Sequence, residues 1–319
     1  MTAKQTPSAT SARRSSAGGG NRTGKNATAA QRRAAQKQAA AQRALAAERG
    51  QRRQWLLVGG AVLAVIAVVG VLVGIKLAAT PANHSSAAQA GSASQQVTSA
   101  VSGVPPKVLD SVGAGSIVTP PTALTGAPLS AQGKPRVLYV GAEYCPYCAA
   151  ERWALAAALS RFGTLSGLGE VSSSPTDVYP NTATLSFHGA GYTSTYLTLT
   201  AKEIEGTQRV GNSYAPLDKL DPADATLFEN IGKGSFPFVD IGGKYAISGA
   251  SYDPSVLQGK TQEQIAAALS DPNSPIGKAI DGTANVITAA VCRVTGNQPG
   301  NVCTSAGVTA AAKALPASG

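Results

Sequence analysis

The sequence predicts an α/β fold for residues 133–291, in which helices flank a central sheet. Three observations support this prediction. A four-residue apolar run, Val137–Val140, is bounded by Gly and Pro, and from Pro146 onward apolar residues recur at three- and four-residue spacing. Two more short apolar runs lie on either side of the pair Gly242-Gly243. Short apolar runs of this kind are typical of buried strands and of a hairpin, whereas the wider spacing is typical of a helix.

The predicted helix, which runs to Phe162, opens with two cysteines, Cys145 and Cys148. Pro146 suits the first turn of a helix, where its missing N–H costs no hydrogen bond. Cys145 is therefore expected at the helix N-terminus, where unpaired N–H groups and the helix dipole stabilise a thiolate. Because Cys148 lies one turn deeper, we assign Cys145 as the nucleophile and Cys148 as the resolving thiol.

Two cysteines three residues apart can also form half of a zinc site or lie unreactive in a core. Zinc needs two further ligands, and the other cysteines, Cys292 and Cys303, are separated by ten residues rather than the usual two to four. The spacing therefore favours redox chemistry, and we expect neither a metal nor a cofactor.

Other elements follow from local patterns. Residues 182–187 and 192–200 are rich in β-branched and aromatic residues, which predicts two strands between the cysteine helix and the hairpin. Residues 217–231 are predicted to form a helix. Beyond the hairpin, two further helices are predicted at 261–269 and 276–291, where apolar residues are in helical phase.

Cys292 and Cys303 enclose a turn-rich loop. Outside the cytoplasm such a pair most simply forms a structural disulfide. The alternative is a second redox pair that relays electrons to Cys145, because exposed disulfides near a terminus are often labile. Residues 292–319 are therefore expected to be a disulfide loop followed by a frayed, Ala-rich tail.

The stretch Glu-Tyr-Cys-Pro-Tyr-Cys at 143–148, placed after an apolar strand, resembles the thioredoxin superfamily, and its Pro-Tyr dipeptide resembles that of glutaredoxins. That superfamily also has a cis-proline loop that faces the cysteines and precedes a hairpin and a final helix. Residues 234–249 have this form, with Pro237 in the place of the cis-proline. The layout, with a membrane anchor, also resembles an uncharacterised family, domain of unknown function 929.

The resemblance implies a thioredoxin-like central sheet flanked by helices and a redox site made of Cys145, Cys148 and Pro237. The sequence departs from the superfamily at Tyr139, where the thioredoxin pattern has a buried acid. About ninety residues separate Cys148 from Pro237, which implies an insertion between the cysteine helix and the cis-proline loop. Glutathione binding is not carried over, because the glutathione-site residues of glutaredoxins are matched only vaguely.

Further candidates for the site are residues beside the cysteines, beside the proline, and in the insertion. Glu143 is negative and opposes the effect of the helix dipole on Cys145. His188, beside two loop glycines, could move protons, because histidine titrates near neutral pH, although a loop histidine is more often structural. The second-rank residues are Glu143, Tyr144, Tyr147, Phe236 and His188.

The charge of the chain is concentrated in one segment. The 319 residues carry a net charge of +10, but residues 1–54 hold 12 Lys or Arg against Glu48 alone. We expect this segment to be a disordered or partly helical cytoplasmic tail that is attracted to anionic lipid. No nucleic-acid partner is expected, because the tail contains no aromatic residue and no reader motif.

A membrane span is predicted at 55–77. Leu56–Ile75 is twenty residues without a charged or polar side chain, long enough for about 30 Å of helix. A secretory signal has a shorter apolar core. Because the basic residues precede the span, the N-terminus is expected in the cytoplasm and the rest of the chain outside it.

The segment 78–132 is rich in Ala, Ser and Pro and is predicted to be a tether. Within it, residues 101–118 contain a few apolar residues, and an alternative is that they begin the folded domain as an edge strand. The thioredoxin-like domain then occupies 133–291.

Taken together, these patterns predict a single-pass membrane protein that displays a thiol-disulfide oxidoreductase outside the cytoplasm. Its expected partners are a protein thiol or disulfide substrate and a redox partner in or outside the membrane. One alternative is a redox-inactive binding or assembly module that keeps the fold and holds its cysteines as stable disulfides. Another is that the basic tail carries the main function.

Overall fold

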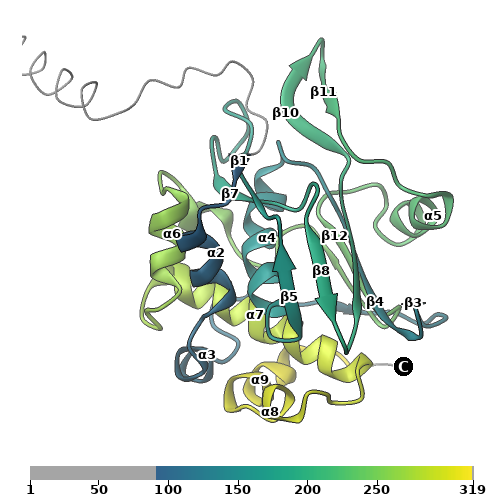
Figure 1. Ribbon diagram of the computed structural model, residues 1–319, viewed down its shortest axis with the longest axis vertical. Helices are drawn as coiled ribbons and strands as arrows, with labels where there is room; N and C mark the ends of the chain where they lie inside the picture. The colour runs from purple at the N-terminus through teal and green to yellow at the C-terminus, as the bar shows by residue number, and fades with distance from the viewer. Residues whose placement is uncertain (1–90, 318–319) are drawn as a thin grey trace, which may run out of the picture. The chain divides into compact units, whose positions relative to one another are not determined.

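The computed structural model describes residues 91–317 of the chain. In this part a central mixed sheet packs against helices, which confirms the predicted α/β class (Figure 1). The predicted basic tail, the predicted membrane span and the first part of the predicted tether lie outside the described residues. Among residues 91–317, no helix combines the length and the apolar character that crossing a membrane requires.

The central sheet is built around β4. This strand pairs antiparallel with β12, with Val140 opposite Phe238, and parallel with β9, with Val140 opposite Lys202. Because β4 is an inner strand, residues 137–140 are all buried, and the sequence is a continuous apolar run rather than an alternating one. The six strands are β2 (Thr122–Ala123), β3 (Ser130–Ala131), β4 (Lys134–Gly141), β9 (Thr198–Glu203), β12 (Phe238–Ile241) and β13 (Tyr245–Ser248).

The predicted hairpin is confirmed, since β12 and β13 pair antiparallel around Gly242 and Gly243. Both glycines have positive φ, 64° and 68°, a region that other residues rarely adopt. A Cβ on Gly243 would also lie 2.4 Å from the carbonyl oxygen of Ala127, so glycine is required there for space as well. The peptide bond Phe236–Pro237, directly before β12, is cis as predicted.

Helix α4 (Pro146–Leu159) is the helix that opens with the cysteine pair. All of its residues except Tyr147 are buried. Its many alanines allow close packing against α7 (Pro275–Val294), and Trp153 reaches the insertion, where its indole N–H donates to the carbonyl of Ala183 at 3.1 Å. The cysteine helix therefore lies in the core of the domain.

The insertion between α4 and β9 forms two small sheets, in which β5 pairs with β8 and β6 lies between β1 and β7. The predicted strand at 182–187 corresponds to β7. The predicted strand at 192–200 is interrupted after Ser194, because the Ser194 hydroxyl accepts hydrogen bonds from the N–H groups of Tyr196 and Leu197 and forms a turn. The strands are β1 (Gly91–Ser92), β5 (Gly163–Ser166), β6 (Gly169–Ser172), β7 (Ala183–Ser186) and β8 (Gly191–Ser194).

A hairpin that the sequence patterns did not predict follows β9 and projects from the end of the central sheet (Figure 1). It consists of β10 (Glu205–Val210) and β11 (Ser213–Pro216). The helix predicted at 217–231 is α5 (Pro222–Asn230). It begins later than predicted because the N–H of Leu217 donates to the carbonyl of Ile204 and closes the base of the hairpin.

The tether prediction is wrong for the described residues before 133. The alternative for residues 101–118 is right in that they belong to the folded domain and wrong in that they form helix and not an edge strand. This segment forms two helices, α2 (Gln95–Ser102) and α3 (Pro106–Val112). Val97 and Val101 are fully buried, because residues four apart lie on one face of a helix and pack against the core. The Ala- and Ser-rich composition suggested a linker, but a few apolar residues at helical spacing pack this segment against the core.

The frayed C-terminal tail is a second wrong prediction within the described residues. The helix predicted at 276–291 continues to Val294, and α8 (Gly300–Cys303) and α9 (Ala306–Ala311) follow. Val308 and Ala311 are buried, and α9 packs against α7 and α3. The predicted disulfide Cys292–Cys303 is confirmed and joins α7 to α8. The predicted helix at 261–269 is α6 (Gln262–Ala268), and η1 (Pro254–Leu257) precedes it.

Candidate active site

The two predicted site cysteines lie at the start of α4. Cys145 is the N-cap residue, and its Sγ accepts a hydrogen bond from the backbone N–H of Cys148 at 3.3 Å. Neither cysteine is disulfide-bonded; Cys145 is 7 % exposed and Cys148 is completely buried. Any partner that reaches this pair therefore reaches Cys145 first.

The two thiols differ in acidity. The pKa of Cys145 is lowered, chiefly because the side chain of Cys148 hydrogen-bonds to its sulfur, and the backbone N–H of Cys148 and the charge of Arg152 act in the same direction. The pKa of Cys148 is raised well above its ordinary value, chiefly by burial. The outer sulfur is the one that more readily becomes a thiolate.

The cis-proline loop lies beside the cysteine pair. Phe236, the residue before the cis Pro237, packs against the small apolar cluster formed by Ala142, Cys145 and Cys148. The carbonyl of Pro237 accepts a hydrogen bond from the N–H of Gly249 at 2.9 Å, which fixes the loop to the end of β13. The structure thus brings Phe236 of the cis-proline loop beside Cys145 and Cys148, although Phe236 and Cys145 are ninety-one positions apart in the sequence.

Aromatic side chains from two other segments border the cysteine turn. Tyr144 stacks on Tyr214 of β11, with ring centroids 3.9 Å apart. Tyr147, 39 % exposed, makes an edge contact with Tyr179, with centroids 5.8 Å apart. Tyr214 was not predicted as a site residue, because nothing in the local sequence showed that its hairpin folds back to residue 144.

The charged second-rank candidates are connected through Ser186. The Ser186 hydroxyl donates to the buried carboxylate of Glu143 at 2.6 Å and accepts from the backbone N–H of His188. The His188 side chain is 43 % exposed, and its Nδ1 lies 3.0 Å from Asp218. In the described structure, the His188 ring is thus paired with this carboxylate, and no hydrogen bond joins it to either cysteine.

A buried polar cluster, which the sequence patterns did not predict, lies beneath the cysteines. Arg152 of α4 and Glu203 of β9 form an ion pair with an Nε–Oε1 distance of 2.7 Å, and both side chains are fully buried. Tyr139 of β4 contacts the pair through its hydroxyl, 3.0 Å from the Arg152 Nε. Arg152 and Glu203 are fifty-one positions apart, so only the fold reveals the pair.

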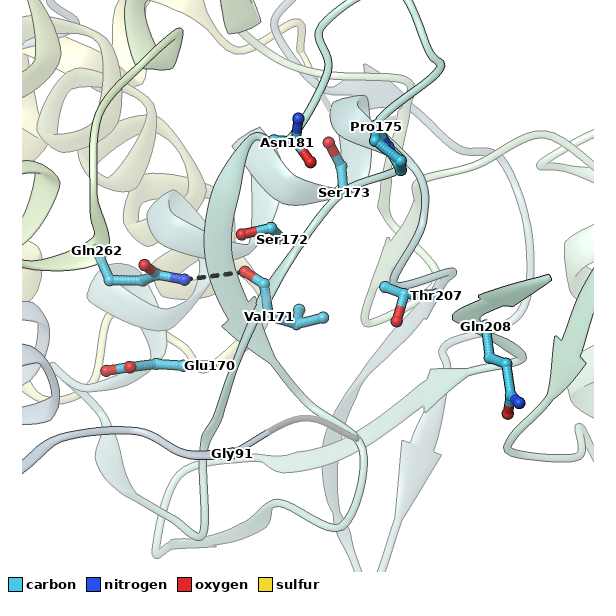
Figure 2. A pocket seen from close by; sticks show the side chains of 10 residues that line it. All are labelled: Gly91, Glu170, Val171, Ser172, Ser173, Pro175, Asn181, Thr207, Gln208 and Gln262. Carbon is cyan, nitrogen blue, oxygen red and sulfur yellow. Dashed lines mark hydrogen bonds between the residues drawn. The ribbon is translucent and has the colours of Figure 1, made fainter. Parts of the chain in front are cut away.

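A surface hollow lies away from the cysteine pair. Figure 2 shows this hollow of about 630 Å³ between β6, the loop that follows it, β10 and the start of α6. Polar side chains, among them Glu170, Ser173, Gln208 and Gln262, line it together with Gly91, Val171 and Pro175, and no predicted site residue lines it. Within residues 91–317, no group of three or more His, Cys, Asp and Glu side chains is placed to hold a metal ion.

Comparison with protein families shows which family the chain resembles. The model of a family described as Domain of unknown function (DUF929) matches residues 121–217 and 229–293, together more than half of the chain. The matched segments contain the cysteine pair, the cis-proline loop and both residues of the buried ion pair. No curated protein and no solved structure matches the chain. The resemblance to this family seen in the sequence is confirmed: the chain belongs to the family described as Domain of unknown function (DUF929).

Proposed function

We propose that this protein is a thiol-disulfide oxidoreductase whose reactive pair is Cys145 and Cys148. The observation that carries the proposal is the position of Cys145. Its sulfur lies at the N-cap of a buried helix, accepts an N–H hydrogen bond, and is flanked by a cis-proline loop. A helix N-terminus stabilises a thiolate, which is the reactive form of the thiol.

The order of elements supports membership of the thioredoxin superfamily. An inner strand, β4, leads into the helix that carries the cysteines, and after an insertion a cis-proline precedes the hairpin β12–β13. Helices α6 and α7 follow, in the place of the final helix. The same elements were expected from the resemblance noted in the sequence.

The proposed reaction transfers two electrons between the cysteine pair and a protein substrate. In the reducing direction, the Cys145 thiolate attacks a substrate disulfide, forms a mixed disulfide and releases one substrate thiolate. Cys148 then loses its proton and attacks Cys145 Sγ, which releases the second substrate thiol and leaves a Cys145–Cys148 disulfide. The reverse sequence oxidises a substrate dithiol, and the reduction potential of the pair sets the direction.

The difference in acidity between the two thiols supports these roles. A lowered pKa increases the fraction of Cys145 present as the attacking thiolate. A raised pKa keeps Cys148 protonated until Cys145 is engaged. Cys148 is also fully buried, so it reacts with Cys145 rather than with the substrate.

We further propose that the domain is displayed outside the cytoplasm by a single membrane anchor. The uncharged run Leu56–Ile75 and the basic residues before it support this topology, as does lipid attraction of the tail. The disulfide Cys292–Cys303 gives independent support, because such bonds persist mainly in oxidising compartments.

The proposal is tested with the full-length protein in detergent. Equilibration in redox buffers of graded potential, followed by thiol trapping, should give one two-electron transition at Cys145 and Cys148. Reduction of a disulfide-bonded protein substrate should be abolished by Cys145→Ser, whereas Cys148→Ser should accumulate the mixed disulfide. A pair that stays oxidised or stays reduced at every accessible potential would contradict the proposal and favour a redox-inactive binding module.

A further inference from the structure

The buried ion pair of Arg152 and Glu203 is satisfied by several hydrogen bonds. Arg152 contacts both carboxylate oxygens of Glu203, at 2.7 and 3.1 Å, and its Nη1 donates to the carbonyl of Leu185 at 3.2 Å. Glu203 also accepts the backbone N–H of Phe187 at 3.3 Å. The cluster is completed by the Tyr139 hydroxyl. The charges are thus held in one fixed arrangement.

Stability alone is a weak reason for such a cluster. Removing two charges from water costs several kcal/mol per ion, and apolar side chains of similar volume often serve the fold as well or better. Arg152 lies two turns after Cys145 on the helix that carries the reactive pair. A positive charge in that position lowers the pKa of the cysteine thiols, whether or not it also stabilises the fold.

One carbonyl joins the ion pair to the cysteine turn. The Arg152 Nη2 donates to the carbonyl oxygen of Ala142 at 2.7 Å, and the same oxygen accepts the backbone N–H of Cys145 at 3.2 Å. The guanidinium therefore fixes the peptide that holds Cys145 in place. Its contact with the Ala142 carbonyl also brings its positive charge to the cysteine turn.

The electrostatics at the sulfurs agree with this geometry. The positive charge of Arg152 lowers the pKa of both Cys145 and Cys148. The negative charge of Glu203 raises the pKa of Cys148, but it acts less strongly there than Arg152 does. The net influence of the two groups favours a thiolate at either cysteine.

We infer that Arg152 is a positioning residue of the thiol site, held by Glu203 and Tyr139, which fixes the Ala142 carbonyl under Cys145 and places a positive charge beside whichever sulfur becomes a thiolate. This role rests on the proposed oxidoreductase function and deepens it. It means that the charged group that shifts the pKa of Cys145 and Cys148 lies on the cysteine helix itself. Strand β4 has Tyr139 where the thioredoxin pattern has a buried acid.

The test compares two double variants of the full-length protein in its reduced state. Arg152→Gln with Glu203→Gln removes both charges and leaves neither one unpaired. The matched control, Arg136→Gln with Asp224→Asn, removes a second ion pair, in which Asp224 is buried and Arg136 is 14 % exposed. Its 2.9 Å contact joins α5 to the opposite end of β4. The readout is the rate of alkylation of Cys145 against pH, with the site identified by mass spectrometry.

In the first variant the pKa of Cys145 should rise by about one unit, which makes alkylation below that pKa about tenfold slower. The control should leave the profile unchanged. Glu203→Gln alone keeps the positive charge and should shift the pKa of the cysteines in the opposite direction, which separates an effect of charge from one of packing. Circular dichroism shows whether each variant is folded.

The inference is overturned if the folded Arg152 and Glu203 double variant has the wild-type profile, or if the control shifts the profile equally. If the double variant does not fold, the test rests on Glu203→Gln alone. A dependence of Cys145 alkylation on pH that equals that of the wild type would then also overturn the inference. Alkylation needs no redox partner, so these outcomes are distinct from a failure of the proposed function. That failure would appear as a wild-type pair that does not cycle in redox buffers.

Discussion

The ring of Tyr214 lies flat against the ring of Tyr144, with centroids 3.9 Å apart and ring planes inclined by 5°. Tyr144 directly precedes Cys145, whereas Tyr214 belongs to the projecting hairpin β10–β11. The Tyr214 hydroxyl donates to Ser174 Oγ at 2.7 Å, and the N–H of Ser174 donates to the carbonyl of Tyr144 at 2.8 Å. The hairpin and the loop after β6 are therefore both attached to the cysteine turn.

Loss of this stack should weaken the domain measurably. We expect Tyr214→Ala to lower the free energy of unfolding by about 1 kcal/mol, because stacked aromatic pairs contribute about that much beyond their buried area. Tyr214→Phe keeps the stack and loses only the hydrogen bond to Ser174, so its effect should be smaller. Urea unfolding followed by tryptophan fluorescence measures both. Equal losses in the two variants would show that the hydrogen bond, and not the stack, attaches the hairpin.

The two cysteines of the pair should react at very different rates. Cys145 is partly accessible and has a lowered pKa, whereas Cys148 is fully buried and has a raised pKa. In the reduced native protein, we expect alkylation of Cys145 to be at least about tenfold faster than that of Cys148 near neutral pH. Quenched alkylation with peptide mass mapping gives both rates. Comparable rates would mean that Cys148 is accessible in solution and would contradict its assignment as the inner, resolving thiol.

The disulfide Cys292–Cys303 should stabilise the domain without taking part in the redox cycle. Replacing both cysteines by alanine should lower the free energy of unfolding by about 2–3 kcal/mol, the loop-entropy estimate for a ring of this size. The potential of the Cys145–Cys148 pair should not change. Redox titration of this variant checks the second expectation. A shifted potential, or loss of turnover at full stability, would instead favour the alternative in which this disulfide relays electrons.

Two buried carboxyl groups should make stability depend on pH. Burial raises the pKa of Asp281 to about 8 and that of Glu151 to about 7. Neither oxygen of Asp281 has a hydrogen-bond partner among residues 91–317, whereas Glu151 accepts two hydrogen bonds from Ser251. Because both pKa values are raised by folding, the protonated forms favour the native state. Their contribution is complete below the unfolded pKa of about 4 and is lost as the pH rises towards 7 and 8.

Asp281→Asn isolates the larger of these two effects. Between pH 5 and pH 8 the wild type should lose stability relative to the variant, by up to about 1.4 kcal/mol per pH unit. The Asn variant should therefore be similar to the wild type in acid and more stable than it in mild alkali. Denaturant unfolding across this pH range measures the difference. A difference that does not change with pH would show that Asp281 is not protonated in the native state.

The sequence predicts those parts of the fold that have local signals. The strand 137–140, the helix after Pro146 and the hairpin around Gly242-Gly243 each carry an apolar pattern or a turn residue that needs no knowledge of the rest of the chain. The cis bond at Pro237 had no local signal of its own and was predicted from the resemblance to the thioredoxin superfamily, in which a cis-proline loop precedes a hairpin. These elements were sufficient to select Cys145 and Cys148 as the candidate reactive pair.

The features that were missed depend on contacts between distant residues. The composition of residues 95–112 suggests a linker, and only their packing against the core makes them helices. The stack of Tyr214 on Tyr144 joins positions seventy residues apart. The Arg152–Glu203 pair requires that α4 and β9 face each other, and β9 follows an insertion that no local pattern places.

The enclosure of α4 has a consequence for any molecular encounter at the cysteines. Of the residues of this helix only Tyr147 is not buried, so the domain encloses the helix on its other faces. Under the proposed function, a protein substrate would approach Cys145 beside Tyr147, and any movement that admits it would belong to the surrounding loops. Under the proposed function, selectivity for the substrate would therefore depend on the segments around residues 179, 214 and 236 rather than on the helix itself.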